Sequence, residues 1–232
     1  MFHYEKAWQD VKARMARAAR AAGRDPDSIR LVAVSKAFPP EAVRIVHALG
    51  QREFGENYVQ DAVAKIDALA ALASVEWHLI GPLQGNKAGI AAARFGWVQT
   101  IDRLRIAERL SVARPASALP LNVCIQVNVS GEGSKSGVPP PEAVALAKAV
   151  AALPRLRLRG IMGIPEPTDD SVRRCAQFRI LRECLDACRA AALPVDTLSM
   201  GMSADLEDAI AEGATLVRVG TAIFGAREPK GE

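Results

Sequence analysis

The feature that most constrains the fold of this chain is a regular alternation of short apolar runs with amphipathic segments. The apolar runs are rich in β-branched residues and have the length of buried strands, as in 29–35 (IRLVAVS) and 97–101 (WVQTI). Each run is followed by a segment with helical spacing of its apolar residues. Strands that alternate with helices form a parallel sheet covered by helices. The sequence therefore predicts an α/β protein.

The number of repeats of this pattern narrows the architecture further. The expected strands span residues 29–35, 52–55, 76–81, 97–101, 121–129, 156–164, 197–201 and 215–220. The expected helices span residues 4–22, 39–49, 58–72, 84–94, 103–112, 139–153, 171–192 and 204–211, with a short helical piece after the last strand. Eight strands predict a closed (β/α)8 TIM barrel with an extra N-terminal helix, as one domain over residues 1–232. The alternative is an open doubly wound sheet, but no GxGxxG motif follows the first strand.

Composition excludes several other classes. Half of the residues are hydrophobic and 24% are charged, which is typical of a globular protein. No apolar run reaches the roughly 18 residues of a membrane span, and the charged N-terminus does not resemble a secretory signal, so we expect a cytoplasmic protein with no membrane partner. The cysteines form no CxxC pair, so we expect reduced packing residues and no metal site. They are Cys124, Cys175, Cys184 and Cys188.

A net charge of +4 raises the question of nucleic-acid binding. Arginines recur at helical spacing near the N-terminus, at Arg14, Arg17, Arg20 and Arg24, and could face phosphates. Aromatic residues make up only 5% of the chain, which leaves few side chains on which bases could stack. We therefore interpret the arginines as a solvated helix face and expect no nucleic-acid partner.

In a barrel of this kind, functional residues gather at the carboxyl ends of the strands. Lys36 directly follows the first expected strand. Partial burial there would lower its pKa and free the amine to form a Schiff base with a carbonyl compound. The alternative is a lysine that extends to water.

The ends of the last two strands carry small and hydroxyl side chains. Gly220 would let backbone N–H groups approach an anion, while Thr221 and Ser203 supply hydroxyl donors. Ordinary turn and capping roles are the alternative. Arg218 shares a strand face with Gly220 and could point inward, toward a pyridine nitrogen or toward an acidic partner in the barrel. A Schiff-base lysine opposite a phosphate cradle describes a pyridoxal 5′-phosphate (PLP) site.

Longer motifs agree with this interpretation and run nearly the whole length of the chain. They are LVAVSKAFPPEAV (31–43), FGENYVQDAVAKI (54–66), WHLIGPLQGNK (77–87), VNVSGEGSKSGV (127–138), LRGIMGIP (158–165), SMGMSADLEDAI (199–210) and VRVGTAIFG (217–225). In this order they resemble the pyridoxal phosphate homeostasis proteins, which are single-domain PLP-binding proteins with the alanine racemase N-terminal barrel.

The resemblance implies a role for each matching residue. It implies PLP bound covalently at Lys36, a phosphate held by Ser203, Gly220 and Thr221 with Ser199 nearby, Asn57 lining the cofactor, Arg218 at the ring nitrogen, and His78 and Met200 as pocket walls. Two positions depart from the family pattern. Gly85 stands where a serine is common, and Gly163 stands where a larger residue is common.

The sequence leaves two classes of function open. The first is a protein without robust catalysis that buffers PLP or delivers it to apo PLP-dependent enzymes, as a monomer. The second is a single-domain amino-acid racemase with Tyr58 or His78 as its second acid–base group. An aldolase-type barrel that uses Lys36 without PLP would not explain the resemblance. Lys87 and Lys135 could be weaker second PLP contacts or ordinary solvated lysines.

Overall fold

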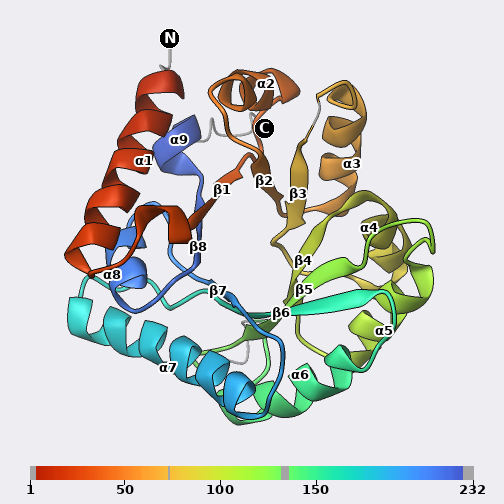
Figure 1. Cartoon of the computed structure of the whole chain (residues 1–232). Coiled ribbons are helices and arrows are strands. Elements are labelled where there is room, and N and C mark those ends of the chain that lie inside the picture. The colour runs from red at the N-terminus through yellow and green to blue at the C-terminus, as the bar shows by residue number, and fades with distance from the viewer. Residues whose placement is uncertain (1–3, 73, 132–135, 227–232) are drawn as a thin grey trace, which may run out of the picture.

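The computed structural model describes residues 4–72, 74–131 and 136–226. Its eight strands are all parallel and close into one barrel in the order β1-β2-β3-β4-β5-β6-β7-β8. The helices form a ring around it, and α1 lies beside α8 and α9 (Figure 1). The predicted (β/α)8 barrel with an extra N-terminal helix is confirmed. In the described ranges, no helix has the length and apolar character needed to cross a membrane. Lys135 lies outside the described residues.

The elements follow the predicted order. The strands are β1 (Arg30–Val34), β2 (Glu53–Glu56), β3 (Glu76–Leu79), β4 (Trp97–Ile101), β5 (Leu121–Val127), β6 (Leu156–Gly163), β7 (Thr197–Ser199) and β8 (Leu216–Val219). The α-helices are α1 (Tyr4–Ala21), α2 (Pro40–Ala48), α3 (Val59–Ala68), α4 (Ala88–Arg94), α5 (Leu104–Ala113), α6 (Ala143–Ala151), α7 (Ser171–Ala190), α8 (Leu206–Ala211) and α9 (Thr221–Phe224). Short 3₁₀ turns are η1 (Pro26–Ser28), η2 (Gly85–Lys87) and η3 (Pro140–Glu142).

Element boundaries account for the differences from expectation. The strands expected over 76–81, 121–129 and 197–201 end two residues earlier, at Leu79, Val127 and Ser199. The helix predicted to reach Leu72 ends at Ala68, because the backbone of Leu69 has already left helical geometry at φ −113° and ψ 12°. Its apolar periodicity continues into the turn, since Leu69 is still buried, and periodicity alone therefore overestimates the helix. The helices expected over 84–94 and 139–153 begin as 3₁₀ turns before α4 and α6.

Strand residues that face outward pack against the helices and make the main hydrophobic core. On β5 these are Leu121, Val123 and Ile125, all fully buried. Each such side chain contributes roughly 1.5–3 kcal/mol when removed from water. This layer is the main source of stability expected for the fold.

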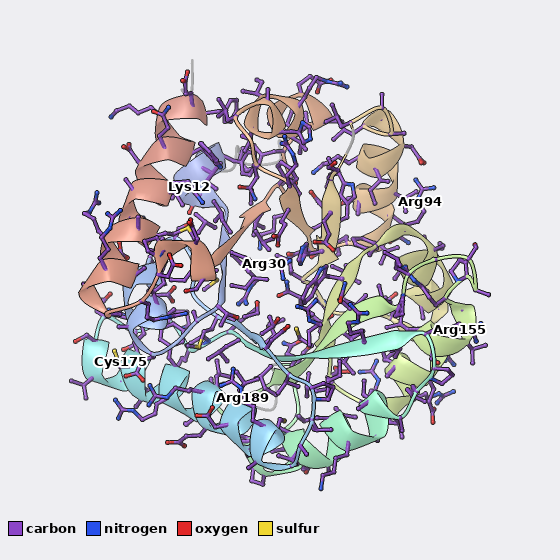
Figure 2. All side chains as sticks on the ribbon, viewed as in Figure 1. Lys12, Arg30, Arg94, Arg155, Cys175 and Arg189 are labelled. Atoms are coloured by element: carbon purple, nitrogen blue, oxygen red, sulfur yellow. The ribbon has the colours of Figure 1, made fainter. Side chains whose placement is uncertain are left out.

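The inside of the barrel is different, because much of it is polar. A small apolar cluster of Trp97, Cys124 and Met162 lies apart from the main core, and the buried Val32, Val34 and Leu216 belong to neither. Figure 2 shows Arg30 near the centre of the ring of strands, whereas Arg94 and Arg189 lie at the periphery. Barrels of this type usually fill the interior with branched aliphatic side chains. A polar interior therefore invites a functional explanation.

Candidate functional site

Pairing of the first and last strands brings Lys36 and Gly220 to the same part of the barrel mouth. β1 lies between β8 and β2 in the barrel. A Cβ atom built at Gly220 would lie 3.3 Å from the backbone oxygen of Val34, two residues before Lys36. Thr221 directly follows Gly220 and begins α9. The structure therefore places the predicted amine and part of the predicted phosphate cradle on adjacent strand ends.

The backbone before Lys36 is held by a buried ion pair. Lys65 Nζ lies 2.5 Å from Glu56 Oε1 and donates to the Ser35 carbonyl at 2.8 Å, and the Ser35 hydroxyl donates to the same Glu56 oxygen at 2.6 Å. We call these three residues the Ser35 clamp. All are buried, while Lys36 itself is half-buried. The sequence analysis missed this clamp, although a lysine on the buried face of a helix was its one visible signal.

Ser203, which is expected at the phosphate, lies in the loop between β7 and α8, and contacts to neighbouring helices hold this loop in place. The Ser203 hydroxyl accepts from the Ala222 N–H at 3.3 Å, so its own proton can still be donated. The Ser203 carbonyl accepts from Arg14 Nη2 at 3.0 Å. Gly201 has φ 92° and packs so tightly that a Cβ would lie 2.5 Å from the Cβ of Ala209. The loop is therefore set by contacts to α1, α8 and α9.

Arg218 points into the barrel and is almost fully buried. It donates from Nη1 to the Ser199 hydroxyl at 2.6 Å and from Nη2 to the Gly163 carbonyl at 2.9 Å. Burial lowers the pKa of Arg218 to about 10, and the Asp205 carboxylate opposes that shift. Both hydrogen-bond acceptors found in the described residues are neutral. A cation in this situation has N–H donors left for a ligand.

His78 lies deeper in the barrel than the mouth residues. It is fully buried, stacks on Trp97 with ring centroids 5.1 Å apart, and its Nδ1 lies 2.9 Å from Gln99 Nε2. Burial lowers the pKa of His78, and the Glu53 carboxylate partly opposes that shift. Gln99 also accepts from Ser199, so it joins His78 to the Arg218 site. The sequence analysis missed Gln99, which appears there only as the polar residue of an apolar strand.

The mouth contains a cavity of about 270 Å³. Its lining residues are Asn57, Ile80, Gly81, Pro82, Gln126, Val127, Asn128, Ser136 and Ile164. Asn57 was predicted at this position, whereas Gln126 and Asn128 were not. Met200 lies elsewhere, because it is fully buried in the main hydrophobic core and follows the inward-facing Ser199.

A second cavity of about 300 Å³ adjoins the first and shares Pro82 and Ser136 with it. Lys87, Arg103 and Tyr58 line it, and Tyr58 is 62% exposed. Arg103 pairs with Asp102 at 2.8 Å. Lys87 therefore lies beside the mouth, on the far side of Pro82.

Comparisons with known proteins give consistent results over most of the chain. Residues 8–228 match the family described as alanine racemase, N-terminal domain. A pyridoxal phosphate homeostasis protein of Pseudomonas aeruginosa is 58% identical over 218 residues, covering 94% of this chain and 93% of that protein. The protein of the same name from Escherichia coli is 51% identical over 220 residues and covers 94% of each chain. The structure of PipY from Synechococcus elongatus with PLP bound superposes with a TM-score of 0.80 at 37% identity, covering 91% of this chain and 100% of that one.

Proposed function

This chain belongs to the pyridoxal phosphate homeostasis proteins, within the alanine racemase N-terminal domain family, and we propose that it binds PLP covalently at Lys36 and holds and releases it without robust catalysis. The observation that carries the proposal is the convergence at one mouth of the β1 lysine, the donors after β7 and β8, and the buried Arg218. We extend the proposal to delivery of PLP to apo PLP-dependent enzymes, by a cytoplasmic monomer.

The residues at the mouth fit the chemistry of PLP. The carbonyl of PLP needs an amine, which Lys36 offers. The phosphate needs hydrogen-bond donors, which Ser203, Thr221 and the backbone at Gly220 offer. The pyridine nitrogen needs a partner, and Arg218 has donors left for it. When bound, PLP would supply a reactive carbonyl and an electron-withdrawing ring.

Arg218 bears on how strong an electron sink bound PLP would be. A guanidinium is a donor only, so it favours an unprotonated pyridine nitrogen. PLP enzymes that depend on a strong electron sink usually place an acidic group there instead, to keep the nitrogen protonated. The mouth cavity adds a second argument. Its lining within the described residues is uncharged, with Asn57, Gln126 and Asn128 as its amides, so it offers no cation to the carboxylate of an amino acid.

The racemase alternative needs an acid–base group on each side of the substrate carbon. Tyr58 is largely exposed and lines the neighbouring cavity beyond Pro82. His78 is fully buried and its Nδ1 is engaged by Gln99. Neither residue lines the mouth cavity, which disfavours the pair as racemisation groups.

The test compares the visible spectrum of the purified protein with those of Lys36→Ala and Lys87→Ala. We expect wild type and Lys87→Ala to show an absorption band of bound PLP that borohydride fixes to the protein, and Lys36→Ala to lose it. Loaded wild type should then restore an apo PLP-dependent enzyme while turning over no amino acid at a useful rate. A borohydride-stable adduct in Lys36→Ala would refute covalent attachment at this lysine, and robust amino-acid turnover would refute the holding role.

A further inference from the structure

A continuous series of polar side chains runs through the inside of the barrel, away from the mouth. Arg218 Nη1 donates to Ser199 Oγ at 2.6 Å, and Ser199 Oγ donates to Gln99 Oε1 at 2.6 Å. Gln99 Nε2 lies 2.9 Å from His78 Nδ1. His78 Nε2 in turn lies 3.3 Å from Glu53 Oε2. We call Arg218, Ser199, Gln99 and His78 the interior relay. Its members come from β8, β7, β4 and β3, so only the closed barrel brings them together.

The direction of each hydrogen bond in the interior relay follows from the groups that face one another. A guanidinium can only donate, so Ser199 Oγ must accept from Arg218. Gln99 turns its amide oxygen toward Ser199 Oγ, and because an amide oxygen only accepts, the Ser199 proton is donated to Gln99. The amide NH₂ group of Gln99 consequently points to His78 and donates to Nδ1. His78 must therefore carry its proton on Nε2 alone, as a neutral imidazole.

The surroundings of His78 agree with a neutral ring. The side chain has no exposed surface, and burial lowers its pKa. The Nε2 atom is close to the Glu53 carboxylate but not aligned for a hydrogen bond. Glu76 and Arg30 are the other charged groups that act on His78, and they act with opposite sign. The Glu53 charge is itself shared with Arg30, which donates to both of its oxygens at 2.9 and 2.8 Å.

We propose that Gln99 and His78 are positioning residues for Arg218, so that the interior relay fixes the orientation in which the guanidinium meets the pyridine nitrogen of PLP. The proposal rests on the proposed function, because it needs PLP at the mouth. Arg218 is buried and donates to two neutral acceptors, the Ser199 hydroxyl and the Gly163 carbonyl. Two acceptors fix the plane of a guanidinium, and Ser199 stays in place only while its own proton has an acceptor in Gln99.

The first test uses the apo protein and does not depend on PLP. Nitrogen-15 NMR of the imidazole rings distinguishes a protonated Nδ1 from an unprotonated one. We expect the His78 resonances, assigned by their loss in His78→Phe, to show an unprotonated Nδ1 and a protonated Nε2 at neutral pH. A proton on Nδ1 would overturn the proposal, because Gln99 would then face His78 with its oxygen and the relay would run in the other direction.

The second test compares Gln99→Leu with Gln51→Leu. Both glutamines are buried, but Gln51 bonds the Leu31 and Glu53 carbonyls and takes no part in the interior relay. We expect the Kd for PLP to rise about tenfold in Gln99→Leu, the scale of one lost buried hydrogen bond, with a shifted absorption maximum of bound PLP. Gln51→Leu should lose folding stability and keep both the Kd and the spectrum.

The outcomes separate this inference from the proposed function. Wild type that binds no PLP would refute the proposed function. Wild type that binds PLP, together with Gln99→Leu at unchanged affinity and spectrum, would refute only the positioning role. If Gln99→Leu does not fold, the NMR measurement on wild type still decides.

Discussion

The arginines at the two ends of the barrel differ in their partners. At the amino-terminal end, Arg30 donates to both oxygens of Glu53, and Arg159 donates to both oxygens of Asp196, at 3.0 and 2.7 Å. At the mouth, Arg218 is more deeply buried and has neutral hydrogen-bond acceptors in the described residues. The first end is complete without a ligand. At the mouth the burial of Arg218 is unfavourable, and PLP bound as we propose would offset that cost.

The amino-terminal end of the barrel also contains a cluster of side chains with the spacing of a metal site. Ligand atoms of Glu53, Glu76 and His78 lie within 4.8 Å of one another. Arg30, however, lies 2.8 Å from Glu53 and 3.4 Å from Glu76, and stacks over Trp97 with its guanidinium 4.6 Å from the ring centroid. The two carboxylates therefore already share one fixed cation, Arg30. Functional groups in such barrels gather at the other end, where the proposed PLP site lies.

The largest effect should come from breaking the buried ion pair between Lys65 and Glu56, behind the mouth. Lys65→Met leaves the Glu56 carboxylate buried without its cation and releases the Ser35 carbonyl. We expect a loss of about 3–5 kcal/mol in the free energy of unfolding, as for other broken buried pairs. Urea denaturation of the apo protein measures it.

The double variant Glu56→Gln/Lys65→Met is the control for this prediction. It removes both charges, so it should be distinctly more stable than Lys65→Met alone. Equal stability of the single and double variants would mean that the ion pair between Lys65 and Glu56 does not stabilise the fold.

The sequence predicted the barrel more completely than the site. Alternation of apolar runs and helical segments depends on local spacing, so all strands were found, with errors at element ends such as Leu69 and Val127. Lys36, Gly220 and Thr221 could be named as candidates because the carboxyl ends of strands are known positions in such a fold. Gln99, Glu56 and Lys65 were missed because their importance depends on partners far away in the sequence. His78 and Met200 were assigned to pocket walls, and the structure places both in buried surroundings that line neither cavity at the mouth.

A smaller loss of folding stability should appear as pH falls, because the buried His78 lies between Glu53 at the amino-terminal end and Gln99 of the interior relay. Its folded pKa lies below the ordinary value of 6.5, so the unfolded chain takes up a proton that the folded chain refuses. We expect the contribution of His78 to the free energy of unfolding to be constant above about pH 6.5. As pH drops below that value, the free energy of unfolding should decrease by up to about 1.4 kcal/mol per pH unit. Denaturation at a series of pH values measures the slope.

His78→Phe is the matched variant, since it keeps a ring on Trp97 and cannot titrate. Its free energy of unfolding should be lower than that of wild type at neutral pH. It should also change less with pH between the ordinary pKa values of histidine and glutamate. Below pH 4.5 both proteins should lose stability, because the pKa of Glu53 is lowered in the fold. Burial raises that pKa, but the nearby His78 ring and the hydrogen bonds from Arg30 outweigh it. Identical slopes in the two proteins at mildly acidic pH would contradict a neutral buried His78.

The smallest effect compares one arginine from each end. Arg14 and Arg159 each form a two-pronged pair with a carboxylate, with side chains 27% and 22% exposed. Each substitution by alanine should cost about 1 kcal/mol of stability, the upper range for partly exposed pairs.

Arg14 additionally donates to the Ser203 carbonyl, and Arg159 instead stacks over Trp97. Arg14→Ala should therefore weaken PLP binding about threefold, less than one full hydrogen bond would, because it loosens the phosphate loop indirectly. Arg159→Ala should leave the Kd unchanged. A PLP titration of the two variants decides, and an equal loss of affinity in both would show that the two ends are not functionally separate.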